Sequence, residues 1–243
     1  MASISARSRL ARVERMEQTL GVAHGLFAER GYAAVTMEEV AGAVGVTKPL
    51  LYNYFGNKER LYIACMERAG DALLVTIAEA VKATASPGEA LGAGLGAFFD
   101  FLDADRAAWA VLFDETLPRG GEVAARVGVY RGRILELVSE AILGQLPARR
   151  RGGARIEVQA LSVAVLGAAE ALARWWLASG AISASDAAAL LISTLEPGLG
   201  LRSGAAVAGG TAPEAGGTAP EAGRTAAKRR TGPDRTEPKG GRG

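Results

Sequence analysis

The stretch TMEEVAGAVGVTKPLLYNYFGNKERL, residues 36–61, decides the fold that we predict for this chain. Thr36 followed three residues later by Glu39 is a capping box, in which each side chain satisfies a free backbone amide at a helix start. Apolar residues then recur at helical spacing until Gly45, which suits the positive φ of a helix end. The pattern predicts a short helix from Thr36, a tight turn at Gly45, and a second short helix from about Thr47.

The second short helix has many hydrogen-bonding side chains on its outer face. Leu51 and Phe55 lie four residues apart and are predicted to anchor it to the core. Thr47 is expected to cap it, and Pro49 fits its first turn, where a missing amide hydrogen costs nothing. Cations, hydroxyls and helix N-termini bind phosphates, whereas amide and apolar groups contact base edges. The helix offers both sets of groups.

These residues resemble the DNA-binding segment of TetR-type (tetracycline-repressor-like) transcriptional regulators. The resemblance covers about residues 12–72 and is carried by GVTKPLLYNYFGNKERLY and the preceding LFAERGYAAVTMEEVAGAV. At Pro49 the family often has Gly or Ala, and at Asn53 it often has His. Both departures lie on the groove-facing helix, so they bear on which sequence is bound. The resemblance implies a dimeric, ligand-responsive regulator, most often a repressor, that binds a palindromic operator in double-stranded DNA.

The expected DNA contacts divide by role. Leu50 and Asn53 are assigned to base edges, and Lys58 stands at the N-terminus of the next helix, where a phosphate is favoured. The complete predicted set is Thr36, Thr47, Lys48, Pro49, Leu50, Tyr52, Asn53, Tyr54 and Lys58.

Composition predicts an all-α protein with a disordered tail, and the family resemblance implies a three-helix helix-turn-helix head followed by a helical ligand-binding and dimerisation bundle. The chain has 243 residues, 49% of them hydrophobic, and few strand-like alternations. We expect the DNA-binding domain at residues 12–72, with its helix-turn-helix at about 36–55. The regulatory and dimerisation domain follows at 73–202. Residues 203–243 contain GTAPEAG twice and a basic run, so they are predicted to be disordered.

The longer helices are predicted from apolar periodicity. The first has Val13, Met16, Leu20, Ala23 and Phe27 facing the core, with His24 on its surface. Residues 149–151, three consecutive arginines, are expected to form a solvated loop. The predicted long helices are Arg9–Arg30, Asn57–Ala83, Glu122–Leu146, Arg155–Ser179 and Ser183–Leu199.

Aromatic residues gather between Ala90 and Leu117. Some of them are expected to line a cavity for a small-molecule effector of unknown identity, although ordinary core packing is the alternative for each. The candidates are Phe98, Phe99, Trp109 and Phe113.

The last two helices form a hairpin with a wide, alanine-rich apolar face. By the family resemblance this hairpin pairs with its twin in a homodimer, and internal core packing is the alternative. The predicted contacts are Leu161, Val165, Leu172, Trp176, Leu191 and Leu195.

Several functional classes are disfavoured. A single cysteine and a single histidine cannot build a metal site, and the glycines form no nucleotide-binding loop, so we expect no enzyme and no cofactor. No signal peptide is evident, and Glu170 and Arg174 interrupt the apolar stretch 160–177, so we expect a cytoplasmic protein without a membrane span. The alternatives are a sequence-tolerant architectural DNA-binding protein aided by its basic tail, and a small-molecule-binding protein whose head no longer binds DNA.

Overall fold

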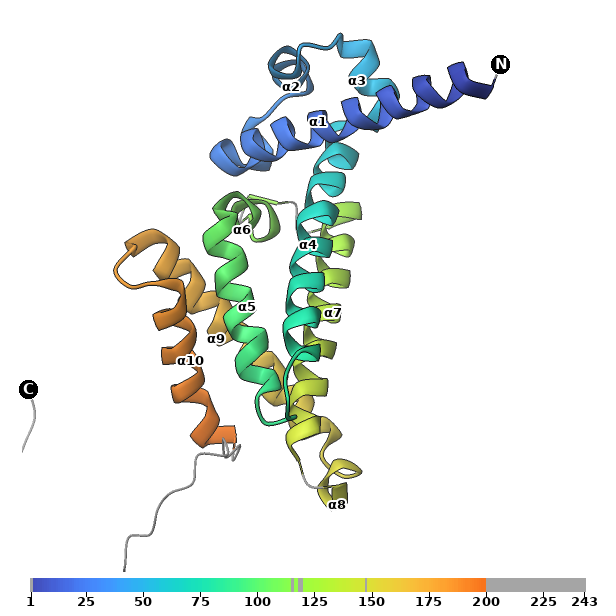
Figure 1. The fold of residues 1–243 in the computed structure, drawn as a ribbon. Coiled ribbons are helices and arrows are strands. Elements are labelled where there is room, and N and C mark those ends of the chain that lie inside the picture. Colours follow the sequence, from blue (N-terminus) through green and yellow to red (C-terminus); the bar gives the residue numbers. More distant parts are fainter. Residues whose placement is uncertain (1, 115, 118–119, 147, 200–243) are drawn as a thin grey trace, which may run out of the picture. The chain divides into compact units, whose positions relative to one another are not determined.

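A computed structural model describes residues 2–114, 116–117, 120–146 and 148–199 (Figure 1). These residues form helices and no strands, which confirms the all-α prediction. The predicted tail lies outside them. The helices are α1 (Ala2–Ala34), α2 (Met37–Val44), α3 (Lys48–Phe55), α4 (Lys58–Lys82), α5 (Ala90–Ala104), α6 (Arg106–Leu112), α7 (Gly121–Gln145), α8 (Ala148–Arg151), α9 (Arg155–Ser179) and α10 (Ala184–Leu199).

The predicted capping box and turn fix the helix-turn-helix. The backbone amide of Glu39 donates to the Thr36 hydroxyl at 3.2 Å, and the Thr36 amide donates to the Glu39 carboxylate at 2.8 Å. Gly45 adopts a φ of 77° and ends α2. Leu51 and Phe55 are buried, so α3 is anchored on the side that its sequence predicts.

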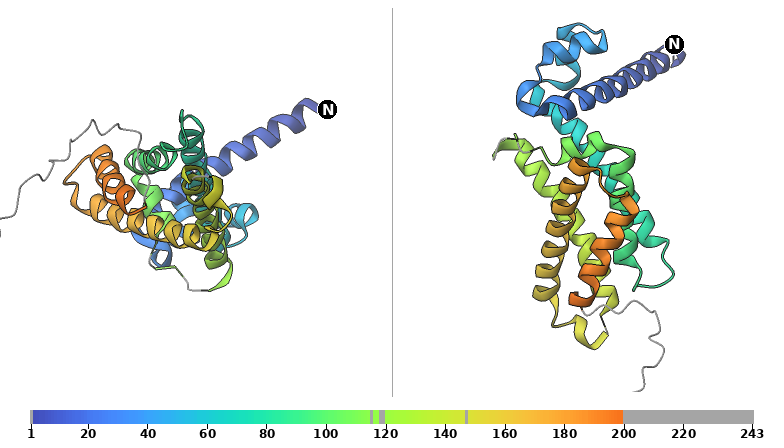
Figure 2. Two further views of the ribbon diagram at one scale, coloured as in Figure 1. Left: turned by 90° about the horizontal axis from the view of Figure 1, so that it is seen from below. Right: turned by 90° about the vertical axis from the view of Figure 1, so that its left-hand side faces the viewer.

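Helix α1 differs from its prediction at both ends. It begins at Ala2, and its backbone breaks at Gly31, whose φ is 74°. Val13 is 52% exposed and so lies outside the core, because the N-terminal part of α1 extends past α2 and α3 (Figures 1 and 2). The core stripe of α1 begins at Met16, which is partly buried against the core, and its residues are buried from Leu20 onward.

The head and the body meet through α4 and the end of α1. The Tyr62 hydroxyl donates to the backbone carbonyl of Val111 at 2.6 Å, and its ring packs edge-on against Phe27. The Tyr32 amide donates to Asp114 at 2.7 Å. A side chain at Gly31 would meet Thr116, so the positive φ and the close approach both require glycine there.

His24 lies buried at this joint, although we predicted it on the helix surface. It is 6% exposed, and its Nε2 atom is 3.7 Å from the Asp105 carboxylate, beyond hydrogen-bond reach. Within the described part of the chain, neither ring nitrogen has a hydrogen-bond partner. Burial lowers the pKa of His24, although the nearby carboxylate of Asp105 opposes that shift.

The body is a helical bundle in which α5 packs against α4 and α10, and α7 packs against α4 and α9. Trp176 of α9 is buried edge-on against Phe99 of α5, with ring centroids 5.6 Å apart. By length and composition α9 is the one described helix that could cross a membrane. Here one side of it packs against α7 and α10, with Glu170 paired to Arg131 of α7.

Two local predictions for the body were incomplete. Asp105 divides the aromatic segment into α5 and α6, and its carboxylate accepts a capping hydrogen bond from the Ala108 amide at 3.0 Å. Residues 149–151 form part of the short helix α8 instead of a loop. Arg151 donates to the carbonyls of Leu146 and Gly144, so it satisfies backbone groups at the end of α7.

A close contact holds α4 against α7 below the head. A Cβ atom at Gly70 would lie 2.6 Å from a ring carbon of Tyr130. The Tyr130 hydroxyl lies 2.8 Å from the Asp71 carboxylate and 3.2 Å from the Glu67 carbonyl, so its single hydrogen is shared between two acceptors and the hydroxyl end of the ring is fixed. Glycine is therefore required at position 70 for the two helices to approach this closely.

We expect Gly70→Ala to destabilise the protein. Alanine favours a helix by about 1 kcal/mol, but overpacking a rigid contact costs about 1–3 kcal/mol. Thermal unfolding should show a lower Tm for Gly70→Ala. The matched control is Gly128→Ala on α7, where a Cβ atom meets nothing within 4 Å, and its Tm should rise. A higher Tm in both variants would contradict the close contact between Gly70 and Tyr130.

We expect His24→Leu to raise the Tm and to remove a pH-dependent loss of stability. Leucine eliminates two unpaired buried nitrogens, which is worth about 1 kcal/mol. Because the folded pKa is lowered, the unfolded chain binds more protons, and wild-type stability falls as the pH drops below the ordinary value of 6.5.

His24 is the only histidine in the sequence, so the comparison needs no second variant. Unfolding curves between about pH 8 and about pH 5.5 measure the effect. If the stability of wild type and of His24→Leu depended on pH in the same way, His24 would not be buried in its neutral form.

Candidate DNA interface and ligand cavity

The outer face of α3 holds most of the predicted DNA contacts. Thr47, Lys48, Pro49, Tyr52 and Asn53 are exposed together there, with Leu50 and Tyr54 half-buried at its edges. Lys48 begins the helix, with Pro49 in its first turn. Thr47 occupies the N-cap position of α3, as predicted, but its side chain makes no capping hydrogen bond. The Thr47 hydroxyl therefore does not bind a backbone amide at the start of the helix.

Thr36 is committed to the start of α2. Its hydroxyl accepts from the Glu39 amide and donates to the Glu39 carboxylate at 2.9 Å. Hydrogen bonds from Arg30 and then from Thr36 lower the pKa of Glu39 to about 2. The carboxylate therefore stays ionised and holds Thr36 in place.

Lys58 has a structural role that the sequence did not reveal. Its ammonium donates to the carbonyls of Tyr32 at 3.0 Å and Ala33 at 3.3 Å. It also lies 4.5 Å from the centre of the Tyr32 ring. The charge thus stabilises the C-terminal end of α1, and any phosphate contact by Lys58 must compete with these carbonyls.

Two charged contacts shape the rest of this face. Lys48 is paired with Glu38 of α2 at 3.2 Å. The guanidinium of Arg12 on α1 lies over the Tyr54 ring, 5.5 Å from its centre. Sequence spacing does not indicate the second contact, because it joins segments more than forty residues apart that only the fold brings together.

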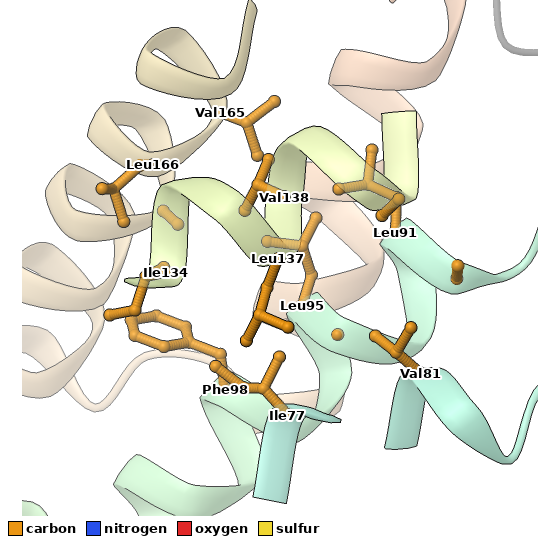
Figure 3. Close-up of a pocket in the computed structure, with 14 residues that line it drawn as sticks. Ile77, Val81, Leu91, Leu95, Phe98, Ile134, Leu137, Val138, Val165 and Leu166 are labelled. Atoms are coloured by element: carbon orange, nitrogen blue, oxygen red, sulfur yellow. The ribbon is translucent and has the colours of Figure 1, made fainter. Parts of the chain in front are cut away.

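A wholly apolar cavity of about 40 Å³ lies between α4, α5, α7 and α9 (Figure 3). Its walls come from helix positions three or four residues apart, so each helix contributes one inward face. The lining residues are Ile77, Val81, Ala90, Leu91, Gly94, Leu95, Phe98, Ile134, Leu137, Val138, Ala141, Val165, Leu166 and Ala169.

Of the four aromatic residues predicted to line a cavity, only Phe98 is in this lining. Phe99 is fully buried against Trp176. Trp109 and Phe113 stack on each other with ring centroids 4.1 Å apart, and Phe113 borders a separate hollow of about 20 Å³ beside Tyr130. The aliphatic lining was missed because its spacing is the same as that of ordinary core positions.

The hairpin α9–α10 presents a different surface from the one predicted. Val165, Trp176 and Leu191 are buried within the single chain, and Leu161, Leu172 and Leu195 are half-buried. The first three therefore pack in the core and are not available on the surface. The exposed large apolar residues of the hairpin are Ile156, Val163, Trp175 and Leu190.

The described residues contain no group of three or more His, Cys, Asp or Glu that could hold a metal ion. Cys65 is buried, and burial raises the pKa of its thiol to about 12. A thiol with that pKa carries no thiolate near neutral pH and is a poor nucleophile. The described residues thus present an exposed helix and an apolar cavity.

Comparison with known proteins agrees with this geometry. The family described as "Bacterial regulatory proteins, tetR family" matches residues 20–65. "Tetracyclin repressor-like, C-terminal domain" matches residues 87–196. The HTH-type transcriptional activator FasR of Mycolicibacterium smegmatis is 32% identical over 170 residues, which are 70% of this chain and 75% of FasR.

Solved structures share the fold. A TetR-like transcriptional regulator from Rhodococcus sp. RHA1 has a TM-score of 0.62 and 30% identity, over 77% of this chain and 97% of that one. AibR, solved in complex with isovaleryl coenzyme A and operator DNA, has a TM-score of 0.62 and 24% identity, over 75% of this chain and 98% of its own. The chain therefore belongs to the TetR family of bacterial transcriptional regulators.

Proposed function

We propose that this protein is a cytoplasmic homodimer that binds a palindromic DNA operator through α3 and is released from it by an apolar or amphipathic ligand. The observation that carries the proposal is the continuous helix α4. Its first residues pack in the head, and its Ile77 and Val81 form part of the cavity wall. A ligand that displaces that wall must also move the head. The protein acts by binding, without catalysis.

We propose repression as the usual outcome of operator binding. FasR is named an activator, and an activator and a repressor can share one DNA-binding mode. Where the operator lies relative to the promoter decides between them. An architectural DNA-binding protein would need neither the internal cavity nor the exposed apolar face of the hairpin, so these two features favour a regulator.

The proposed DNA contacts follow from the exposed face of α3. Thr47, Lys48 and Tyr52 offer a hydroxyl, an ammonium and a phenol for phosphates, and Asn53 offers an amide for a base edge. Leu50 lies at the edge of the same face. Glu38 sits beside Lys48, so DNA binding has to transfer the lysine from a carboxylate to a phosphate.

The proposed dimer uses the outer face of the hairpin. Ile156 and Val163 are exposed on one side of α9, Trp175 is exposed on a neighbouring side of the same helix, and Leu190 is exposed on α10. In the right-hand view of Figure 2 the two helices lie side by side in front of the bundle. Four large apolar residues exposed on one helical hairpin support an interface there. Small alanines and a glycine between the large residues allow close helix approach.

The proposed ligand occupies the apolar cavity. A volume of about 40 Å³ is far below the several hundred Å³ of a typical ligand site, so binding must part the helices. Displacement can reach the head by two routes. The first route is α4 itself. The second is α5, which lines the cavity through Phe98. The residue that follows its last turn, Asp105, lies beside His24 of α1. AibR, bound to an acyl-coenzyme A, supports an acyl chain as the apolar part.

We expect Glu38→Gln to tighten binding to every duplex by about threefold at low salt, because it frees Lys48 and removes a negative charge near the phosphates. Asn53→Ala should instead reduce the ratio of specific to random affinity. Glu79→Gln, an exposed glutamate at the far end of α4, is the control. A salt titration of duplex binding measures all three variants. No change in Glu38→Gln at low salt would place this face away from DNA.

We expect Val163→Glu to give a folded monomer with weak operator binding. Val163 is 55% exposed in the single chain, so glutamate is tolerated there, but a buried unpaired charge in an interface is costly. The matched control is Val129→Glu on α7, which is similarly exposed and should remain dimeric. Sedimentation and operator binding measure both. A Val163→Glu dimer with unchanged operator affinity would exclude this interface.

A further inference from the structure

A second hollow lies on the outer side of the contact between α4 and α7. It is an open groove of about 370 Å³. Leu74, Val75 and Ala78 of α4 form one wall, and the other is formed by Arg133, Glu136, Leu137 and Glu140 of α7. Leu137 also lines the apolar cavity (Figure 3). Its side chain therefore stands between the groove and the cavity.

The cavity can accept only the apolar part of an amphiphile. Its described lining offers no polar side chain, and burying an unpaired polar group costs several kcal/mol. The polar head must stay outside. Toward the DNA-binding head the seam between the helices is closed by the contact of Tyr130 with Gly70. Leu137 is the one described residue that lines both the groove and the cavity, so the passage between them is placed beside it.

The groove is lined by side chains of both charges. Arg133 is the one cation among its described lining residues. It lies 3.5 Å from Asp71 and over the Tyr130 ring, 5.6 Å from its centre, and its side chain is 55% exposed. It can therefore donate to an acceptor oxygen. Glu136 and Glu140 add two carboxylates on the same wall. They repel a negatively charged head such as a free carboxylate, and they tolerate an uncharged carbonyl.

We propose that this groove is the headgroup site of the ligand and that Leu137 is the gate through which the tail enters the cavity. The class of ligand is an acyl ester or thioester, whose carbonyl oxygen accepts a hydrogen bond from Arg133. A free fatty acid is disfavoured by Glu136 and Glu140. This inference rests on the proposed function, because it assumes that the cavity holds the tail.

The test compares two probes with the same tail, the neutral thioester S-decanoyl-N-acetylcysteamine and the anion decanoate, by isothermal titration calorimetry. Wild type should bind the thioester more tightly by about fivefold, the effect of two exposed like charges. In Glu136→Gln/Glu140→Gln this preference should disappear, mainly because decanoate binds better. Arg133→Gln should weaken thioester binding by about fivefold.

Two controls separate the groove from the cavity. Glu79→Gln/Glu157→Gln removes two exposed glutamates outside the groove and should keep the wild-type preference. Ala141→Leu fills the cavity and should abolish binding of both probes, with folding checked by Tm. An unchanged preference in Glu136→Gln/Glu140→Gln, with binding still lost in Ala141→Leu, would overturn the headgroup site alone. Binding that survives Ala141→Leu, or no binding by wild type, would overturn the proposed cavity as well.

Discussion

The structure depends on the continuity of α4. Its 25 residues make a rod about 37 Å long that belongs to two cores at once. Leu61 and Tyr62 are buried in the head, and Ile77 near the other end is buried beside the cavity. A helix of this kind transmits displacement along its length, because it contains no proline at which it would kink sharply. Any change in the width of the body is therefore also a change in the direction of the head.

The joint around α6 decides how that change reaches the DNA-binding surface. Tyr62 and Tyr32 tie the head to the backbone of Val111 and to the carboxylate of Asp114. His24, in contrast, faces Asp105 without a hydrogen bond. The His24 ring and the Asp105 carboxylate, 3.7 Å apart, are thus the weaker of the contacts at this joint.

Local signals predicted the parts of the fold that local chemistry controls. The capping box at Thr36 and the periodicity of residues 155–179 gave α2 and α9 within a residue of their observed bounds. The site was less predictable. The outer face of α3 follows from helical spacing, but the attachment of Lys58 to α1 and the burial of His24 depend on segments distant in sequence. The cavity lining was not predicted, because aliphatic residues that line a cavity have the same helical spacing in the sequence as residues of a packed core.

The central claim is that opening the cavity moves the two heads of a dimer relative to each other. Two recognition helices must lie about 34–36 Å apart to enter successive major grooves. Because Cys65 is buried, spin labels can be attached selectively at Ala43→Cys, an exposed position on α2. The measurement is the label-to-label distance distribution with and without S-decanoyl-N-acetylcysteamine. The account predicts a clear shift of the distribution when the thioester binds. Saturating, calorimetrically verified binding with an unchanged distribution would contradict it.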